Sequence, residues 1–227
     1  MQSRMPILAA ALGIALLGAQ TAFADDLKGV LSRLDTAAAN FHTTTTNFEF
    51  DAVTTQPIYD KDVQKGIQFF KREGHSFQWG ARIQEENGRP ADRELTFAAG
   101  KVLYFDVPGN EERQIDASKY ESYLLLGFGA SGKELAEKWN IKYLGAELIN
   151  GVKTDKLELI AKDPNVLEQI RKVTIWLDTD HAVSLKQVFD EGGGTIRTCI
   201  YSNIKNNEPL PKDAFTLKTN KQTKMVK

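Results

Sequence analysis

The sequence of 227 residues has one cysteine, three histidines and seven prolines. A lone cysteine excludes an intrachain disulfide framework and a cysteine-rich zinc site, and the low proline content excludes collagen-like and low-complexity chains. Neither sign of charge dominates, because 29 Lys and Arg stand against 30 Asp and Glu. Duplex nucleic acid binds a concentrated basic face, so no nucleic-acid partner is expected. With 41 % hydrophobic residues the chain can bury a core, and one domain is expected.

Long hydrophobic runs are also scarce, and the longest run without a charged residue lies near the N-terminus. It runs from Ile7 to Ala19, after Arg4 and before an Ala22-Phe23-Ala24 cleavage pattern, which is typical of a secretory signal peptide. It is shorter than the roughly 20 residues of a membrane-spanning helix. The sequence therefore predicts a cleaved signal peptide over residues 1–24. The remainder, 25–227, is expected to be a single soluble domain of the periplasm, with a frayed tail from about residue 219.

The spacing of apolar residues changes along the chain. Residues 26–41 place one at every third or fourth position, which predicts an amphipathic helix that ends before the β-branched run Thr43–Thr46. Apolar residues then alternate, and turn signals such as Asn150-Gly151 recur, which is typical of an antiparallel meander. Shorter helices are expected at 133–139 and 165–172. Such a sheet either closes into a barrel or curves beneath helices. The helix-rich middle favours an α+β fold with a curved antiparallel sheet of about ten strands, an incomplete barrel whose concave side the helices cover.

Signatures of catalysis are weak. The run Gly127–Lys133 has the glycine spacing of a phosphate-binding loop, but Glu134 stands where such a loop needs Ser or Thr for Mg²⁺. We interpret this run as a flexible glycine hinge between two helical pieces. The histidines lack metal-binding spacing, and the one cluster, Asp178, Asp180 and His181, has the composition of a tight turn. No catalytic residue, no cofactor and no metal site is therefore expected.

Apolar residues two apart along a strand share a face, and this parity selects candidates for a hydrophobic cavity. Phe69 and Phe70 cannot share a face, and Phe70 is assigned to the cavity because it has the parity of Arg72. The full candidate set is Phe48, Phe50, Phe70, Phe77, Trp79, Leu95, Phe97, Tyr104, Ile175 and Leu177. A hydrophobic segment in the middle of the chain would form a lid over the cavity through Leu124, Leu125, Leu126 and Phe128. A packed core is the alternative interpretation of all these residues, and Cys199 is interpreted as a small buried strand residue.

Segments spread over the chain resemble the outer-membrane lipoprotein carrier family (LolA-like). The opening helix up to Phe41-His42 is similar to the family's first helix, and Gly66–Arg72 to its second strand, which ends in Lys-Arg. Further similar segments, in the family's order, are Phe77-Gln78-Trp79, Gly100–Phe105 through Pro108, Ile175–Asp178, Phe189–Gly192, Tyr201–Ile204 and Pro209–Phe215. The resemblance spans most of residues 26–218.

The resemblance implies an incomplete barrel of eleven strands around a cavity for the acyl chains of lipoproteins. The implied cargo is an acylated lipoprotein or another lipid, and the implied partners are an inner-membrane release complex and an outer-membrane acceptor. The protein is then expected to be a monomeric carrier and not an enzyme. The family's arginine that hydrogen-bonds the lid and controls its opening corresponds to Arg72. Its expected acceptors are helix carbonyls near Asn40 and in Tyr120–Phe128, which lack intrahelical partners where a helix ends.

Two other functions stay open. The same half-barrel could serve as a non-enzymatic binding module for another lipid or for a regulatory partner. An exported hydrolase would have to use the cluster at Asp178, Asp180 and His181.

Overall fold

The computed structural model describes residues 26–74, 76–98, 100–117, 123 and 126–226. The predicted signal peptide and two of the predicted lid residues, Leu124 and Leu125, lie outside the described residues. No helix among the residues described is both long enough and apolar enough to cross a membrane.

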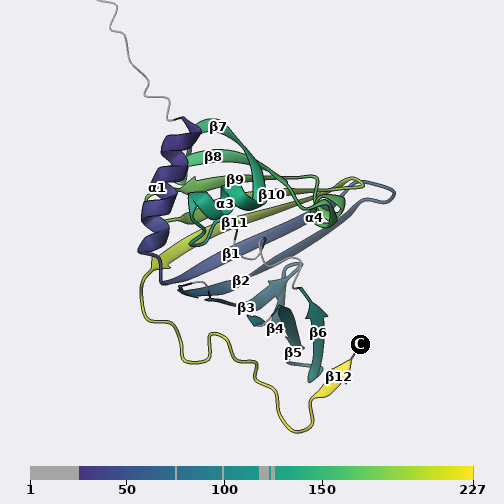
Figure 1. Ribbon diagram of the computed structural model, residues 1–227. Helices are drawn as coiled ribbons and strands as arrows, with labels where there is room; N and C mark the ends of the chain where they lie inside the picture. The colour runs from purple at the N-terminus through teal and green to yellow at the C-terminus, as the bar shows by residue number, and fades with distance from the viewer. Residues whose placement is uncertain (1–25, 75, 99, 118–122, 124–125, 227) are drawn as a thin grey trace, which may run out of the picture.

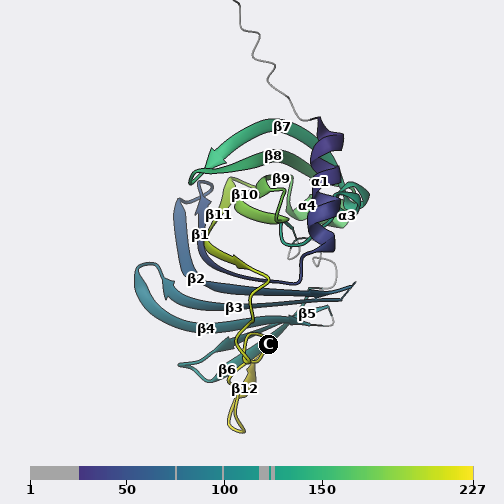
Figure 2. The same cartoon turned by 90° about the vertical axis from the view of Figure 1, so that its left-hand side faces the viewer.

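A twelve-stranded sheet forms the body of the molecule; it curves strongly and stays open, as Figure 1 and Figure 2 show. Its strands are β1 (Thr43–Thr54), β2 (Asp60–Glu73), β3 (Ser76–Glu86), β4 (Arg89–Ala98), β5 (Lys101–Asp106), β6 (Glu111–Asp116), β7 (Trp139–Ile149), β8 (Val152–Ala161), β9 (Lys172–Asp178), β10 (Val183–Gly192), β11 (Thr195–Asn206) and β12 (Lys224–Val226). They lie in the order β12-β6-β5-β4-β3-β2-β1-β11-β10-β9-β8-β7, and all neighbours are antiparallel except β12 and β6. The predicted half-barrel is confirmed, with one strand more than the eleven expected.

The three predicted helices are confirmed to within a few residues as α1 (Leu27–Ala39), α3 (Gly132–Lys138) and α4 (Pro164–Gln169). Asp26 caps α1, since its side chain accepts from the backbone N–H of Gly29 at 2.7 Å. Figure 2 shows α1 and α3 across the concave side at the β7–β10 end of the sheet. The helices therefore cover only part of the hollow.

The buried apolar residues form two clusters. One lies beneath the helices and joins α1, α3 and α4 to β8 and β9, with Val30 and Leu157 fully buried. The other lies on β1 to β4, β10 and β11 and is rich in aromatic rings, among them Phe48, Phe70 and Trp79. Both clusters lie on the concave face of the sheet, but the helices cover only the cluster on β8 and β9.

The glycine-rich connection before α3 packs closely against its neighbours, and its interpretation as a flexible hinge stays a prediction. Gly129 has a φ of 71°, and a Cβ at this position would overlap the ring of Phe41. Gly132 lies against the backbone of Leu31 in α1, where any side chain would force the two helices apart. Glycine is used here because it allows close approach and a left-handed backbone.

The chain after β11 passes over the sheet face that points away from the hollow. It lies on Gly80, where a Cβ would collide with the carbonyl oxygen of Ala214. Buried Glu94 accepts from the backbone N–H of Lys218 at 2.7 Å, and β12 then pairs with β6. The segment after Lys218, for which the sequence predicts fraying, is therefore held along the sheet. Its contacts are mainly polar and backbone ones, which leave no hydrophobic periodicity in the sequence.

Candidate ligand cavity

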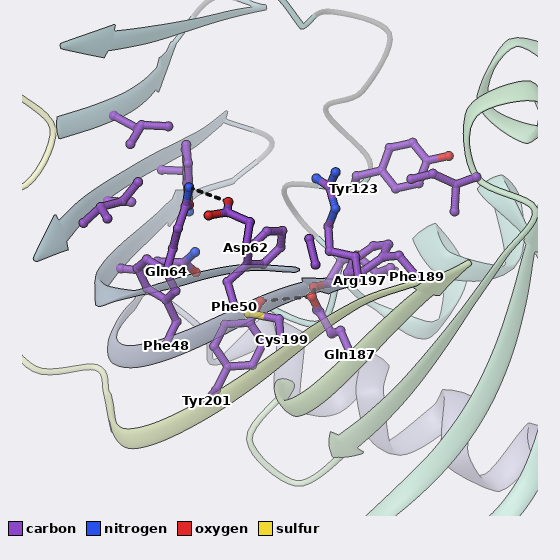
Figure 3. Close-up of a pocket in the computed structure, with 18 of the residues that line it drawn as sticks. Phe48, Phe50, Asp62, Gln64, Tyr123, Gln187, Phe189, Arg197, Cys199 and Tyr201 are labelled. Atoms are coloured by element: carbon purple, nitrogen blue, oxygen red, sulfur yellow. Dashed lines mark hydrogen bonds between the residues drawn. The ribbon is translucent and has the colours of Figure 1, made fainter. Parts of the chain in front are cut away.

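A cavity of about 560 Å³ lies on the concave side, over the aromatic cluster. This volume falls within the range of small-molecule sites. Figure 3 shows side chains from β1, β2, β10 and β11 converging on it, among them Phe48, Phe50, Gln187 and Tyr201. Its full lining is Phe48, Phe50, Ala52, Asp62, Gln64, Gln68, Phe70, Trp79, Ala81, Ile83, Leu95, Tyr123, Leu126, Ile170, Gln187, Phe189, Glu191, Arg197, Cys199 and Tyr201.

Half of the cavity residues predicted from parity line this space, namely Phe48, Phe50, Phe70, Trp79 and Leu95. Phe77 and Phe97 belong to the same aromatic cluster but lie outside the cavity lining. Their ring centroids are 6.3 Å apart, and the ring centroid of Phe77 is 6.2 Å from that of Phe70. Tyr104 lies further along the sheet on β5, where burial raises its phenol pKa despite the nearby guanidinium of Arg93.

Ile175 and Leu177 were predicted to line the cavity, and this prediction is wrong. Both lie on β9 and are fully buried in the cluster beneath the helices, together with Val30 and Leu34 of α1. Their alternation does place them on the concave face. Whether a concave residue meets a helix or an empty space depends on where α1 packs, and strand parity carries no information on that.

The floor of the cavity is polar and uncharged. The amide of buried Gln187 donates to the carbonyl of Leu126 at 2.5 Å, and its oxygen accepts from the Tyr201 hydroxyl at 2.9 Å. Burial raises the pKa of Tyr201 well above its ordinary value and that of the neighbouring Cys199 thiol to about 12. Both groups are therefore protonated at neutral pH, and Cys199 is the buried strand residue that the sequence predicts.

Sequence reasoning missed the polar part of the lining because it selected apolar residues alone. Asp62 and Gln64 share parity with Phe70 on β2, and Arg197 shares parity with Cys199 on β11. The same alternation therefore contained the signal. Polar residues on a face assigned to a cavity are candidates for its lining as much as apolar ones.

Arg72 closes the rim of the cavity next to its apolar end. Its side chain is only 15 % exposed, donates to the carbonyl of Gly129 at 2.5 Å and forms an ion pair with Glu134 of α3. It also donates to the carbonyl of Gly74 at 3.2 Å. The expected acceptors were helix carbonyls, but among the described residues the guanidinium forms no hydrogen bond with Asn40. The main acceptors are instead one loop carbonyl and one carboxylate.

Glu134 can meet Arg72 because of its position in α3. It is the third residue of the helix and forms a capping box with Ser131, whose backbone N–H donates to the carboxylate at 2.9 Å. Burial alone would raise the pKa of Glu134, but the hydrogen bonds from Arg72 and Ser131 outweigh it and hold the pKa below its usual value. The carboxylate is therefore charged at neutral pH.

The two described lid residues lie beside this contact. Leu126 lines the cavity, and the ring of Phe128 stacks on Phe70 with centroids 3.9 Å apart. Phe128 also meets Tyr201 edge to face at 4.8 Å and forms a backbone bridge with Val183 of β10. Phe128 thus joins β2 and β11 through its ring and β10 through its backbone at the closed end of the cavity.

Among the residues described, no three His, Cys, Asp or Glu side chains are placed to hold a metal ion. The nitrogen Nδ1 of His181 lies 2.7 Å from a carboxylate oxygen of Asp178, at the turn between β9 and β10. Both residues border a second hollow, of about 430 Å³.

No family model matches the chain. A curated relative, an uncharacterized protein from Methanocaldococcus jannaschii, is 29 % identical over 126 residues. That match takes in 55 % of this chain and 35 % of the relative, so it spans about a third of the relative's length.

Solved structures are similar in fold at low sequence identity. An uncharacterized conserved protein from Thermus thermophilus has a TM-score of 0.55 at 8 % identity, covering 88 % of this chain and 97 % of that one. MucB has a TM-score of 0.52 at 12 % identity, covering 85 % and 62 %, and the Pseudomonas aeruginosa MucA/MucB complex has 0.50 at 13 %, covering 85 % and 61 %. A LolA superfamily protein from Nitrosomonas europaea has 0.43 at 14 %, covering 86 % and 99 %. The structures with a TM-score of 0.50 or more share the open half-barrel fold with this chain.

Proposed function

We propose that this protein is a non-enzymatic carrier that binds the acyl chains of lipoproteins and moves them toward the outer membrane. The observation that carries the proposal is the cavity of about 560 Å³, lined mostly by aromatic and aliphatic side chains and closed at one end by Phe128 and Arg72. The LolA-like fold and the resemblance of the sequence to lipoprotein carriers support the choice of cargo.

The energetics suit reversible binding. Burying one methylene contributes about 0.8 kcal/mol, so ten buried methylenes contribute about 8 kcal/mol. Release requires an opposing free energy, and re-forming the Arg72 contacts with the loop and α3 supplies part of it. Arg72 would thus set the balance between holding and delivering the cargo.

The proposal includes export. The predicted signal peptide at residues 1–24 would direct the single domain 25–227 to the periplasm, where an inner-membrane release complex loads it and an outer-membrane acceptor unloads it. Fractionation of cells that express the full chain tests this part, and retention of the protein in the cytoplasm would contradict it.

Native mass spectrometry of the protein purified from its own cell envelope tests the cargo. Ala81 lines the cavity, so Ala81→Phe should fill it and abolish copurifying acylated species. Gln78→Phe places the same side chain on the exposed opposite face of β3 and serves as the control. Thermal melting of both variants excludes loss of fold. Wild-type protein that carries no acylated species, and that binds no added acylated peptide, would refute the proposal.

The likeness to MucB, which has been solved in a complex with MucA, favours a second candidate. In this alternative the half-barrel is a regulatory module that binds a partner protein. Depleting the protein separates the two, because only a carrier leaves outer-membrane lipoproteins at the inner membrane.

A further inference from the structure

The cavity has one charged end. On the sheet, Ala52 of β1 lies opposite Asp62 of β2 and opposite Arg197 of β11, so these three lining residues form one row. Glu191 of β10 lies beside Arg197 in the same region. Along β2 the row is eight residues from Phe70, which corresponds to about 26 Å. The charges therefore lie at the end of the cavity farthest from the Arg72 contacts.

The charges in this row are unevenly balanced. Arg197 forms a two-point pair with Glu191, at 3.0 Å through Nη2 and 2.8 Å through Nε, and its guanidinium lies over the ring of Phe50. Arg171, whose guanidinium approaches Gly192, adds positive charge beside Glu191. The β10 side thus carries two guanidinium groups together with the carboxylate of Glu191.

The β2 side carries a carboxylate without a cation. Asp62 accepts from the side-chain amides of Gln64 at 3.3 Å and Asn87 at 2.9 Å, and among the described residues no Lys or Arg forms an ion pair with it. The adjacent Lys61 has the opposite parity and pairs with Asp51 at 2.8 Å on the other face of the sheet. Figure 3 shows the Asp62 carboxylate at the cavity with Gln64 beside it.

We infer that the ligand carries a positively charged group next to its apolar chain and places this group at Asp62. The chain then runs along β2 toward Phe48, Phe70 and Trp79. A half-buried carboxylate held by two neutral donors attracts a cation, because neither donor compensates its charge. A zwitterionic lipid head group and a lysine close to the acylated end of a polypeptide both present this chemistry. The inference rests on the proposed function, since it presupposes an apolar chain in the cavity.

Amphiphiles that share one alkyl chain and differ in the head group test the inference. The probes are a lysophosphatidylethanolamine, an alkyl trimethylammonium, an alkyl sulfate and an alkyl maltoside, each measured below its micelle concentration by displacement of a fluorescent fatty acid. Two acylated peptides, one with lysine and one with glutamine after the acylated residue, distinguish the polypeptide source from the lipid source.

The wild-type protein should bind the zwitterionic and cationic probes about tenfold more tightly than the maltoside, and the sulfate no more tightly. Asp62→Asn should abolish this preference by lowering the affinity for the zwitterionic and cationic probes to the affinity for the maltoside. Asp51→Asn, which removes a carboxylate from the opposite face, should retain it. Equal affinity for all heads, a preference for the sulfate, or a preference that survives Asp62→Asn would overturn the inference while leaving the carrier function standing. Failure of every alkyl probe to bind would instead refute the carrier function itself.

Discussion

Replacing Arg72 by leucine removes the side chain that ties β2 to the lid connection and α3. The lost contacts are the hydrogen bond to the Gly129 carbonyl and the ion pair with Glu134. A hydrogen bond from a charged group contributes about 1.5–3 kcal/mol. The Glu134 side chain is 40 % exposed, so its pair contributes nearer 1 kcal/mol. Closure should therefore weaken by about 2.5–4 kcal/mol, which is about 60- to 700-fold in the ratio of closed to open molecules.

The protein contains its own reporter of opening. Cys199 is the one cysteine of the sequence, lies in the cavity wall and is 3 % exposed. A thiol reagent can attack it only after the cavity opens, when burial no longer holds the thiol pKa near 12. If opening and closing are fast compared with attack, the labelling rate follows the open fraction. Arg72→Leu should then be labelled about 60- to 700-fold faster than wild type.

The neighbouring residue supplies a matched control. Lys71 pairs with Glu73 at 2.6 Å, both side chains are solvent-exposed, and Lys71→Leu removes a contact of little energetic weight. It should leave labelling unchanged. Denaturant unfolding of both variants excludes a global effect. Unchanged labelling in Arg72→Leu, or equal acceleration in both variants, would refute the assignment of Arg72 as the residue that closes the cavity.

Three further predictions follow from other contacts. Trp79→Asp should weaken binding of a fluorescent fatty acid more than tenfold, whereas Gln78→Asp, on the exposed opposite face, should leave it unchanged. Because the pKa of Glu134 is lowered in the folded protein, its stabilising charge is present above the unfolded pKa and is lost as the pH falls through the folded one. Thiol labelling with dithiodipyridine, corrected for its intrinsic pH dependence, should accelerate over that acidic range in wild type and not in Glu134→Gln. Asp155 is buried and accepts from an arginine of α1 at 2.7 Å, so Asp155→Ala should lower the free energy of unfolding by about 2–4 kcal/mol in urea, and a loss below about 0.5 kcal/mol would contradict this.

Much of the fold could be predicted because local patterns agree with the tertiary structure. The apolar stripe of residues 26–41 has the helical period, and Asn150-Gly151 has the positive φ values that a tight hairpin needs. The strand β12 was not predicted, because three residues that pair in parallel with an edge strand leave no periodic signal in the sequence. Glu134 was not predicted as the partner of Arg72, because the two residues are far apart in sequence and only the fold brings them together.

The candidate site was predicted only in part, for a physical reason. Alternation correctly selects the concave face, yet Phe70 lines the cavity while Ile175 is packed under α1. These two residues differ in what covers them, and that depends on how helix and sheet pack across long sequence separations. The glycine run raises the same difficulty: glycine at 129 and 132 allows close packing against Phe41 and Leu31, and sequence alone cannot separate this use from flexibility.

The contacts of α1 indicate which part of the lid can move. Arg33 holds α1 to Asp155 of β8 at 2.7 Å, and the backbone N–H of Lys133 holds α3 to Asp35 of α1 at 2.9 Å. These bonds join both helices to the half of the sheet that they cover, over a fully apolar cluster. Moving α1 would expose that cluster, whereas moving the connection around Phe128 disrupts its ring contacts with Phe70 and Tyr201, its backbone bridge, and the hydrogen bonds from Gln187 and Arg72. The smaller cost lies with the connection, so access to the cavity should involve residues 126–130 while α1 stays in place.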